Sequence, residues 1–290
     1  MNLSSAILST LAYHDIFDYP LDFSDVYNLL IQKKASVALV KRELIRLREQ
    51  KRVGEVSGYY FLKNRKKIAR IRKLRAQYSQ TKLKRAAFFA GLLRIIPSVK
   101  LVAVSGALAM RNSSKGDDID LVVITSKGLL WTTRLLANVL LLPFKRDPAG
   151  QKISDRACLN MFLDESDLSI NDHNMYTAHE ICQMLPLWDR QDTYRRFIKA
   201  NEWVKKYLPN WQQSSQFTIH SSQKRGLSTV KGQLSIVESL LRQFQLWYMK
   251  NKLTTEKISS TQLFFHPKDT QAWVIAEYQK RLKKLNIANP

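Results

Sequence analysis

The chain of 290 residues has only two cysteines, Cys158 and Cys182, and neither lies in a cluster with metal-ligand spacing. Two cysteines cannot build a disulfide framework, and a zinc knuckle needs more ligands at short intervals. This scarcity fits a reducing compartment, so we expect a cytoplasmic protein. A basic segment ahead of the first apolar run, residues 6–12, is also missing, and we therefore expect no signal peptide.

Long apolar runs are missing as well. The longest, residues 129–144, contains Arg134 and Asn138 and is interrupted by Pro143. It falls short of the roughly 20 apolar residues that a membrane span needs. We therefore expect a buried amphipathic helix here and no membrane among the partners.

Acidic residues are scarce relative to basic ones, with 24 Asp and Glu against 47 Lys and Arg and a net charge of +23. The hydrophobic content of 45% supports a sizeable core and excludes a disordered chain. Soluble proteins this basic commonly bind a polyanion, with RNA or DNA as the first candidate and an anionic membrane surface as the second. The alternative is a solvated basic surface without a specific partner. The oligomeric state is left open.

Residues 1–62 predict three helices followed by a hairpin. A helical stripe begins at Ile7, Asp22 or Ser24 can cap a second helix, and Ser36 can cap a third. Two strand-like runs flank a Ser-Gly turn within residues 52–62. This order resembles the winged helix-turn-helix family, in which the third helix takes the recognition position. The resemblance implies nucleic-acid contacts or, equally, a protein-contact module. The candidate contacts on the third helix are Lys41, Arg42 and Arg46.

Residues 63–86 predict a basic connecting helix. Between residues 63 and 85 there are eleven Lys or Arg and no acid, while Ile68, Ile71, Leu74 and Tyr78 recur at helical spacing and predict a packed face. The basic face is either solvated or follows nucleic-acid phosphates. Its candidate contacts are Lys66, Lys67, Arg70 and Lys73.

From residue 87 onward, helices and strands alternate. The apolar patterns predict a helix at 87–95, strands at 99–105 and 119–125, a helix at 129–142 and a strand at 157–163. Further helices are expected at 175–185, 193–207, 236–249 and 270–285. The polar composition near 210–233 predicts a flexible segment.

Three aspartates at the start of the 119–125 strand form the most informative motif. Side chains alternate along a strand, so Asp118 and Asp120 point to one side while Ile119 points to the core. Two neighbouring carboxylates repel each other unless a cation lies between them, and oxygen ligands of this kind suit Mg²⁺. Acidic clusters of this type more often cap a turn. The glycine loop twelve residues earlier, at Gly106, favours a metal site.

The stretch from Ser105 to Asp120 resembles the nucleotidyltransferase superfamily related to DNA polymerase beta, whose pattern is Gly-Ser, about a dozen residues, and Asp-hydrophobic-Asp on the next strand. The resemblance covers residues 97–163. It implies that an acceptor hydroxyl attacks a nucleoside triphosphate at a site of one or two Mg²⁺ ions held by Asp118 and Asp120. The implied nucleotide-binding residues are Ser105, Gly106, Ala107, Arg111 and Lys115.

Two positions depart from the family pattern. Ala107 stands where the family has serine, and Ser105 is directed elsewhere if the strand continues through it. The third carboxylate that active members carry on a later strand is replaced, at the best-placed position, by Asn160, which we take as a third catalytic candidate. An amide ligates a metal but supplies no charge. The alternatives for the third ligand are Asp155, Asp164 and Glu165.

The predicted organisation is α+β. A winged-helix-like domain (1–62) is followed by a basic connecting helix (63–86), a nucleotidyltransferase-like domain with a mixed sheet (87–170) and a C-terminal helical region (171–290). The favoured function is metal-dependent transfer of a nucleoside monophosphate to an unidentified hydroxyl acceptor, with RNA as a candidate. The alternative is a catalytically inactive member of the fold that binds nucleic acid.

Overall fold

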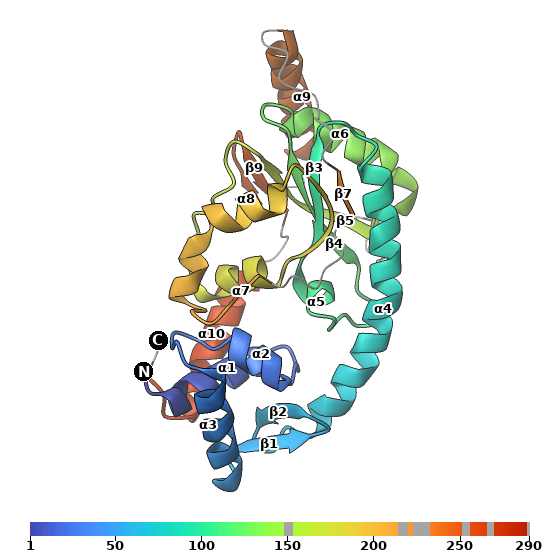
Figure 1. Cartoon of the computed structure of the whole chain (residues 1–290). Coiled ribbons are helices and arrows are strands. Elements are labelled where there is room, and N and C mark those ends of the chain that lie inside the picture. The colour runs from blue at the N-terminus through green and yellow to red at the C-terminus, as the bar shows by residue number, and fades with distance from the viewer. Residues whose placement is uncertain (148–152, 214–219, 223–232, 251–255, 266–269, 289–290) are drawn as a thin grey trace.

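The computed structural model describes residues 1–147, 153–213, 220–222, 233–250, 256–265 and 270–288. These residues form an α+β protein, which confirms the predicted fold class. Figure 1 shows the N-terminal helices and hairpin at one end and the central sheet above them, with a long helix running beside both. None of the described helices has the length and apolarity needed to cross a membrane.

The N-terminal module, residues 1–62, contains α1 (Leu3–Asp15), α2 (Phe23–Asn28), α3 (Val37–Glu49), β1 (Val53–Val56) and β2 (Tyr59–Leu62). Side chains of Asn2, Asp22 and Ser36 accept backbone N–H groups at the three helix starts, so Asp22 caps α2 rather than Ser24. Both hairpin-turn residues have positive φ, which suits a two-residue turn. The three helices and the hairpin are therefore as predicted.

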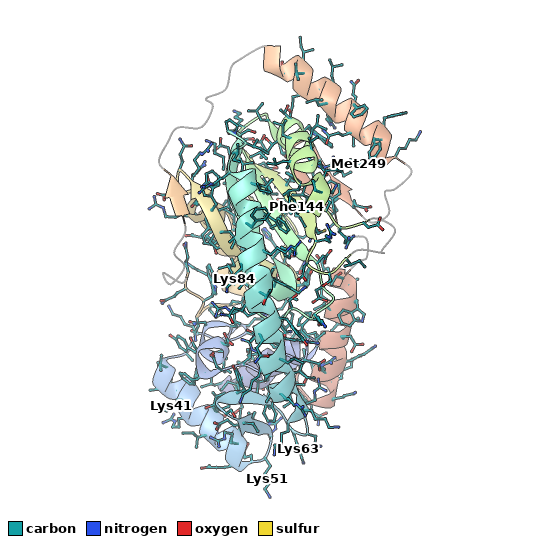
Figure 2. The ribbon with its side chains drawn as sticks, turned by 90° about the vertical axis from the view of Figure 1, so that its right-hand side faces the viewer. Lys41, Lys51, Lys63, Lys84, Phe144 and Met249 are labelled. Carbon is teal, nitrogen blue, oxygen red and sulfur yellow. The ribbon has the colours of Figure 1, made fainter. Side chains whose placement is uncertain are left out.

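The helix α4 (Lys67–Leu93) is continuous, where the sequence predicted a connecting helix and a separate helix at 87–95. No proline interrupts it, and its only glycine, Gly91, lies near its end. Figures 1 and 2 show that it links the hairpin to the sheet. The prediction that Leu74 belongs to the packed face is wrong, because Leu74 is exposed. The buried positions instead follow a stripe through Ile68, Arg72, Ser79, Lys82, Ala86, Phe89 and Leu93.

The described residues form a mixed seven-stranded sheet in the order β7-β6-β3-β4-β5-β9-β8. Its strands are β3 (Val99–Val104), β4 (Ile119–Thr125), β5 (Ala157–Asp164), β6 (Leu185–Arg190), β7 (His220–Ser222), β8 (Lys257–Ile258) and β9 (Gln262–Phe264). Strand β3 is antiparallel to β4 and β6, while β4 is parallel to β5. The central strands β3 and β4 are buried on both faces, which explains their continuous apolar sequences.

Helices cover both faces of this sheet. The remaining helices are α5 (Gly106–Ala109), α6 (Leu130–Leu140), η1 (Leu142–Phe144), α7 (Met175–Gln183), α8 (Thr193–Ala200), η2 (Glu202–Lys206), α9 (Gln233–Met249) and α10 (Thr270–Lys284). One core contains Phe89 of α4 and Trp131 of α6 against the sheet. The other contains residues of α7, α8 and α10 and extends to Tyr13 of α1. The N-terminal module therefore packs against the C-terminal helix.

The prediction that residues 171–290 are helical is incomplete. Strands β6 to β9 come from this region and extend the sheet on both sides. The expected helix at 193–207 is divided into α8 and η2 at Asn201, whose buried amide bonds to the backbone of Leu168, Ile170 and Phe197. The flexible segment predicted near 210–233 lies mostly outside the described residues.

Candidate functional site

The two aspartates of the motif lie at the start of β4, a central strand of the sheet. Ile119 and Leu121 are fully buried, so the apolar side chains hold the strand in place and direct Asp118 and Asp120 to the opposite side. Their carboxylate oxygens and the Cys158 sulfur all lie within 4.8 Å of one another. The alternation predicted from the sequence therefore brings the two acids together.

The glycine loop lies directly beside this pair. Gly106 has φ +61°, a conformation that favours glycine, and a Cβ added there would lie 3.6 Å from Asp120 Oδ2. The backbone N–H of Ser105 donates to the Asp120 carbonyl at 3.2 Å. Ser105 and Ala107 line one cavity with Asp120. The predicted direction of Ser105 is wrong, because β3 ends at Val104 and Ser105 is the N-cap residue of α5.

Cys158 of β5 is the third member of the cluster, and the sequence did not reveal it. Strands β4 and β5 are parallel, and their register pairs Asp120 with Cys158. The thiol hydrogen-bonds to the Asp120 carboxylate, and burial raises its pKa, so the thiol is protonated. Asn160 lies two residues further along β5, past an irregularity in the register, and lines the cavity with Asp120.

The other three acids considered as a third ligand have partners of their own. Asp155 accepts from Lys82 Nζ at 2.7 Å. Asp164 accepts from the Gly128 N–H at 2.6 Å and Glu165 from Arg196 Nη2 at 2.8 Å. These contacts hold the three acids to partners other than Asp118 and Asp120.

An arginine that the sequence analysis missed provides positive charge at the site. Arg146 Nη1 donates to Asp118 Oδ2 at 2.9 Å. Its backbone N–H bonds to the carbonyl of Ala157 at the start of β5, which brings the segment after η1 alongside the two aspartates. Burial alone would lower the pKa of Arg146, but the negative surroundings, including the paired Asp118 carboxylate, outweigh it and raise the pKa. The pair of acids is thus partly neutralised by the chain itself.

A third carboxylate reaches the site from a helix rather than from a strand. Glu180 of α7 lies beside Gly106, one of the residues predicted to bind nucleotide, and the Gly106 N–H acts to lower the pKa of the Glu180 carboxyl. Burial, together with the charge of Asp120, raises the pKa of Glu180 to about 7. No short motif links Glu180 to the aspartates, because the contact depends on how α7 packs against α5.

Asp120 also titrates near neutrality. Burial is the main cause that raises its pKa, to about 7, and the negative charge of Asp118 adds to it. The Cys158 hydrogen bond and the charge of Arg146 act in the opposite direction. A bound cation would favour the ionised form of Asp120, and the ionised form would in turn hold the cation more tightly.

Two neighbouring cavities give access to these groups. One of about 220 Å³ is lined by Asp120, Gly106, Asn160 and Glu180, among others. The second, of about 170 Å³, is more apolar and is lined in part by Met161, Ile181 and Phe264. Ser105, Tyr176, Glu180 and Thr270 line both. Asp120 therefore faces open volume.

The predicted phosphate contacts Arg111 and Lys115 are exposed and lie on the loop after α5. Their backbone carbonyls are held from α4: Arg72 Nη1 donates to that of Arg111 at 3.0 Å and Lys82 Nζ to that of Lys115 at 3.1 Å. Three basic residues of α4, Arg72, Arg75 and Lys82, thus face inward and fix the loop and its surroundings. They are structural rather than part of a cationic surface.

The candidate nucleic-acid contacts remain on the outside of α3 and on or next to the first turns of α4. All seven are exposed: Lys41, Arg42, Arg46, Lys66, Lys67, Arg70 and Lys73. Figure 2 shows Lys41 and Lys63 at the end of the molecule formed by the N-terminal module. The structure therefore separates these cations from the acidic cluster.

Comparison of the chain with protein-family models, curated proteins and solved structures gave no match.

Proposed function

We propose that the chain is a cation-dependent nucleotidyltransferase whose site is formed by Asp118, Asp120 and the Gly106 loop. The observation that carries this proposal is the convergence of both carboxylates within 4.8 Å of each other, next to a glycine with φ +61° and an open cavity. Backbone close to a pair of acids is what a metal-bound triphosphate requires.

The residues present fit a hard divalent cation through two ligands. Carboxylate oxygens from Asp118 and Asp120 suit Mg²⁺ or Mn²⁺, which complete their coordination with water and substrate phosphate oxygens. Such an ion, when bound, would neutralise charge on the entering and leaving oxygens. Cys158 does not fit Mg²⁺, because a thiol suits softer metals. Its protonated side chain instead orients the Asp120 carboxylate.

Arg146 and Glu180 control the charge that a nucleotide meets. Arg146 pairs with Asp118, and its guanidinium suits a bidentate phosphate contact once a cation replaces it. Glu180 lies beside the Gly106 N–H, and its ionised carboxylate would repel phosphate. Nucleotide binding therefore requires Glu180 to take up a proton or turn away, and a pKa of about 7 makes protonation accessible.

The test is transfer of label from nucleoside triphosphates carrying ³²P at the alpha phosphate. Purified protein is incubated with each triphosphate, Mg²⁺ or Mn²⁺, and either total cellular RNA or a small-molecule extract. Label transfer that disappears in Asp120→Asn and persists in Asp192→Asn supports the proposal. Asp192 is a suitable control because it is an exposed aspartate remote from β4. No transfer to either acceptor pool with any triphosphate contradicts it.

A second function is a catalytically inactive nucleic-acid-binding protein. It is favoured by two features of the site: Arg146 already neutralises Asp118, and the Glu180 carboxyl lies beside the Gly106 N–H. Binding would then lie on the winged-helix-like N-terminal module and the start of α4. A salt-sensitive mobility shift of RNA or DNA that is lost in Lys41→Ala with Arg42→Ala, and unaffected by Asp120→Asn and by Lys84→Ala, supports this function.

A further inference from the structure

Helix α9 packs against α6 through one face. The Glu238 carboxylate accepts from the Thr132 N–H at 3.0 Å and from the Thr132 hydroxyl at 2.6 Å, at the start of α6. Gln245 Nε2 donates to the Trp131 carbonyl at 2.9 Å, and Met249 is buried at the end of the helix. These residues recur at helical spacing and fix the orientation of α9.

An apolar face of α9 is exposed on the side of the helix that faces away from these contacts. Its residues follow one another at intervals of one, three or four positions, and Trp247 retains 72% of its surface. They are Ile236, Val237, Leu240, Phe244 and Trp247. On α6, which α9 packs against, and on η1, Leu136, Val139 and Leu142 are exposed too, at 45%, 63% and 71%. We call these eight residues the α6–α9 apolar surface.

This surface is a concentration of side chains rather than scattered exposure. Half of the large hydrophobic residues that are exposed in the described part of the chain lie on α6, η1 and α9. Figure 1 shows α9 beside α6 at the end of the molecule away from the N-terminal module. Soluble proteins rarely leave apolar patches of this kind uncovered, and such patches mark interaction sites.

We propose that the α6–α9 apolar surface binds peripherally to an anionic lipid bilayer. A helix with an exposed apolar stripe containing Trp and Phe lies in the plane of a membrane interface with its polar side in water. The polar side of α9 carries Arg242 and Lys250, both exposed. The sequence between Trp203 and Val237 contains no acid, so the segment leading into α9 is cationic.

The net charge of the chain favours a bilayer over a second copy of the chain as the partner of this surface. With a net charge of +23, two copies repel each other at long range, whereas an anionic surface attracts the chain. This inference departs from the expectation that no membrane is a partner. That expectation was based on the absence of a membrane-spanning run. The exposed stripe could not be predicted from the sequence, because it depends on which face of α9 packs against α6.

The test uses the full chain and vesicles of phosphatidylcholine with or without phosphatidylglycerol. Co-sedimentation is expected with the anionic vesicles only, with a blue shift of tryptophan emission. Trp247→Ser is expected to weaken binding about tenfold, since one large apolar side chain is lost from the interface. Trp273→Ser is the matched control, because Trp273 is also exposed, at 53%, but lies on α10. It is expected to bind like wild type.

A second variant, Leu240→Glu with Phe244→Glu, is expected to abolish vesicle binding; both positions are exposed, so the thermal unfolding midpoint should stay unchanged. Three results would overturn the proposal. The first is that wild type does not bind anionic vesicles. The second is that both variants bind the vesicles as tightly as wild type, which would mean that charge alone acts. The third is that the variants abolish a concentration-dependent dimer while vesicles have no effect.

Discussion

Replacing Asp120 by asparagine removes the most strongly perturbed acid of the candidate site. The pKa of Asp120 is raised from 3.8 to about 7, mainly by burial and then by the charge of Asp118. The folded chain therefore binds this proton more tightly than the unfolded chain does. The stability contributed by the protonated form is complete below about pH 4 and is lost as the pH rises through 7.

The expected change in the free energy of unfolding follows from the size of this pKa change. Each tenfold change in proton affinity corresponds to about 1.4 kcal/mol, which sets an upper bound near ~4 kcal/mol. Glu180, whose pKa is raised to about 7 by burial and by the charge of Asp120, shares the effect, so the expected gain for Asp120→Asn at about pH 8 is ~2 kcal/mol. Below about pH 4, where Asp120 is protonated in the folded and the unfolded chain alike, the variant and wild type should unfold at equal urea concentrations.

The assay is urea unfolding at both pH values without divalent cations and again with Mn²⁺. A bound cation should reverse the order at about pH 8, because it stabilises wild type by ~2.7 kcal/mol at a hundredfold excess over Kd and the variant less. Asp192→Asn, at an exposed position, is the control and should follow wild type. A variant that is equally or less stable than wild type at about pH 8 without cations would refute the reasoning.

Three further predictions concern the framework of the site. Gly106→Ala should lower the free energy of unfolding by ~1 kcal/mol, because φ at this position is +61°. Gly91→Ala, inside α4, should raise the free energy of unfolding by ~0.5–1 kcal/mol. The urea concentration at the unfolding midpoint measures both effects. Lys82→Met should destabilise by ~2 kcal/mol and expose the 111–117 loop to protease, while the exposed neighbour Lys84→Met should do neither. Arg146→Gln should tighten Mn²⁺ binding severalfold in calorimetry, since a competing cation is removed; weaker binding would contradict its assigned role.

Local sequence patterns predicted those parts of the site that lie on one strand or one loop. Asp118 and Asp120 share a side because strand side chains alternate, and Gly106 approaches them because it follows the end of β3, which pairs with the start of β4. The same patterns predicted the N-terminal helices and hairpin, where caps and a turn mark each boundary.

Contacts between distant segments could not be predicted in this way. Cys158 instead of Asn160 lies opposite Asp120 because of the parallel register between β4 and β5. Arg146 and Glu180 arrive from a segment after η1 and from α7, at positions that only the packed structure determines. The strand β6 was missed because Pro186 and its charged end obscure an apolar pattern.

The most direct test of the central claim is a measurement of Mn²⁺ binding by electron paramagnetic resonance, with and without a nucleoside triphosphate. The account predicts protein-bound Mn²⁺ whose affinity increases with the nucleotide and is lost in Asp118→Asn and Asp120→Asn. A wild-type protein that binds no Mn²⁺ in either condition, or variants that bind it as tightly as wild type, would contradict the account.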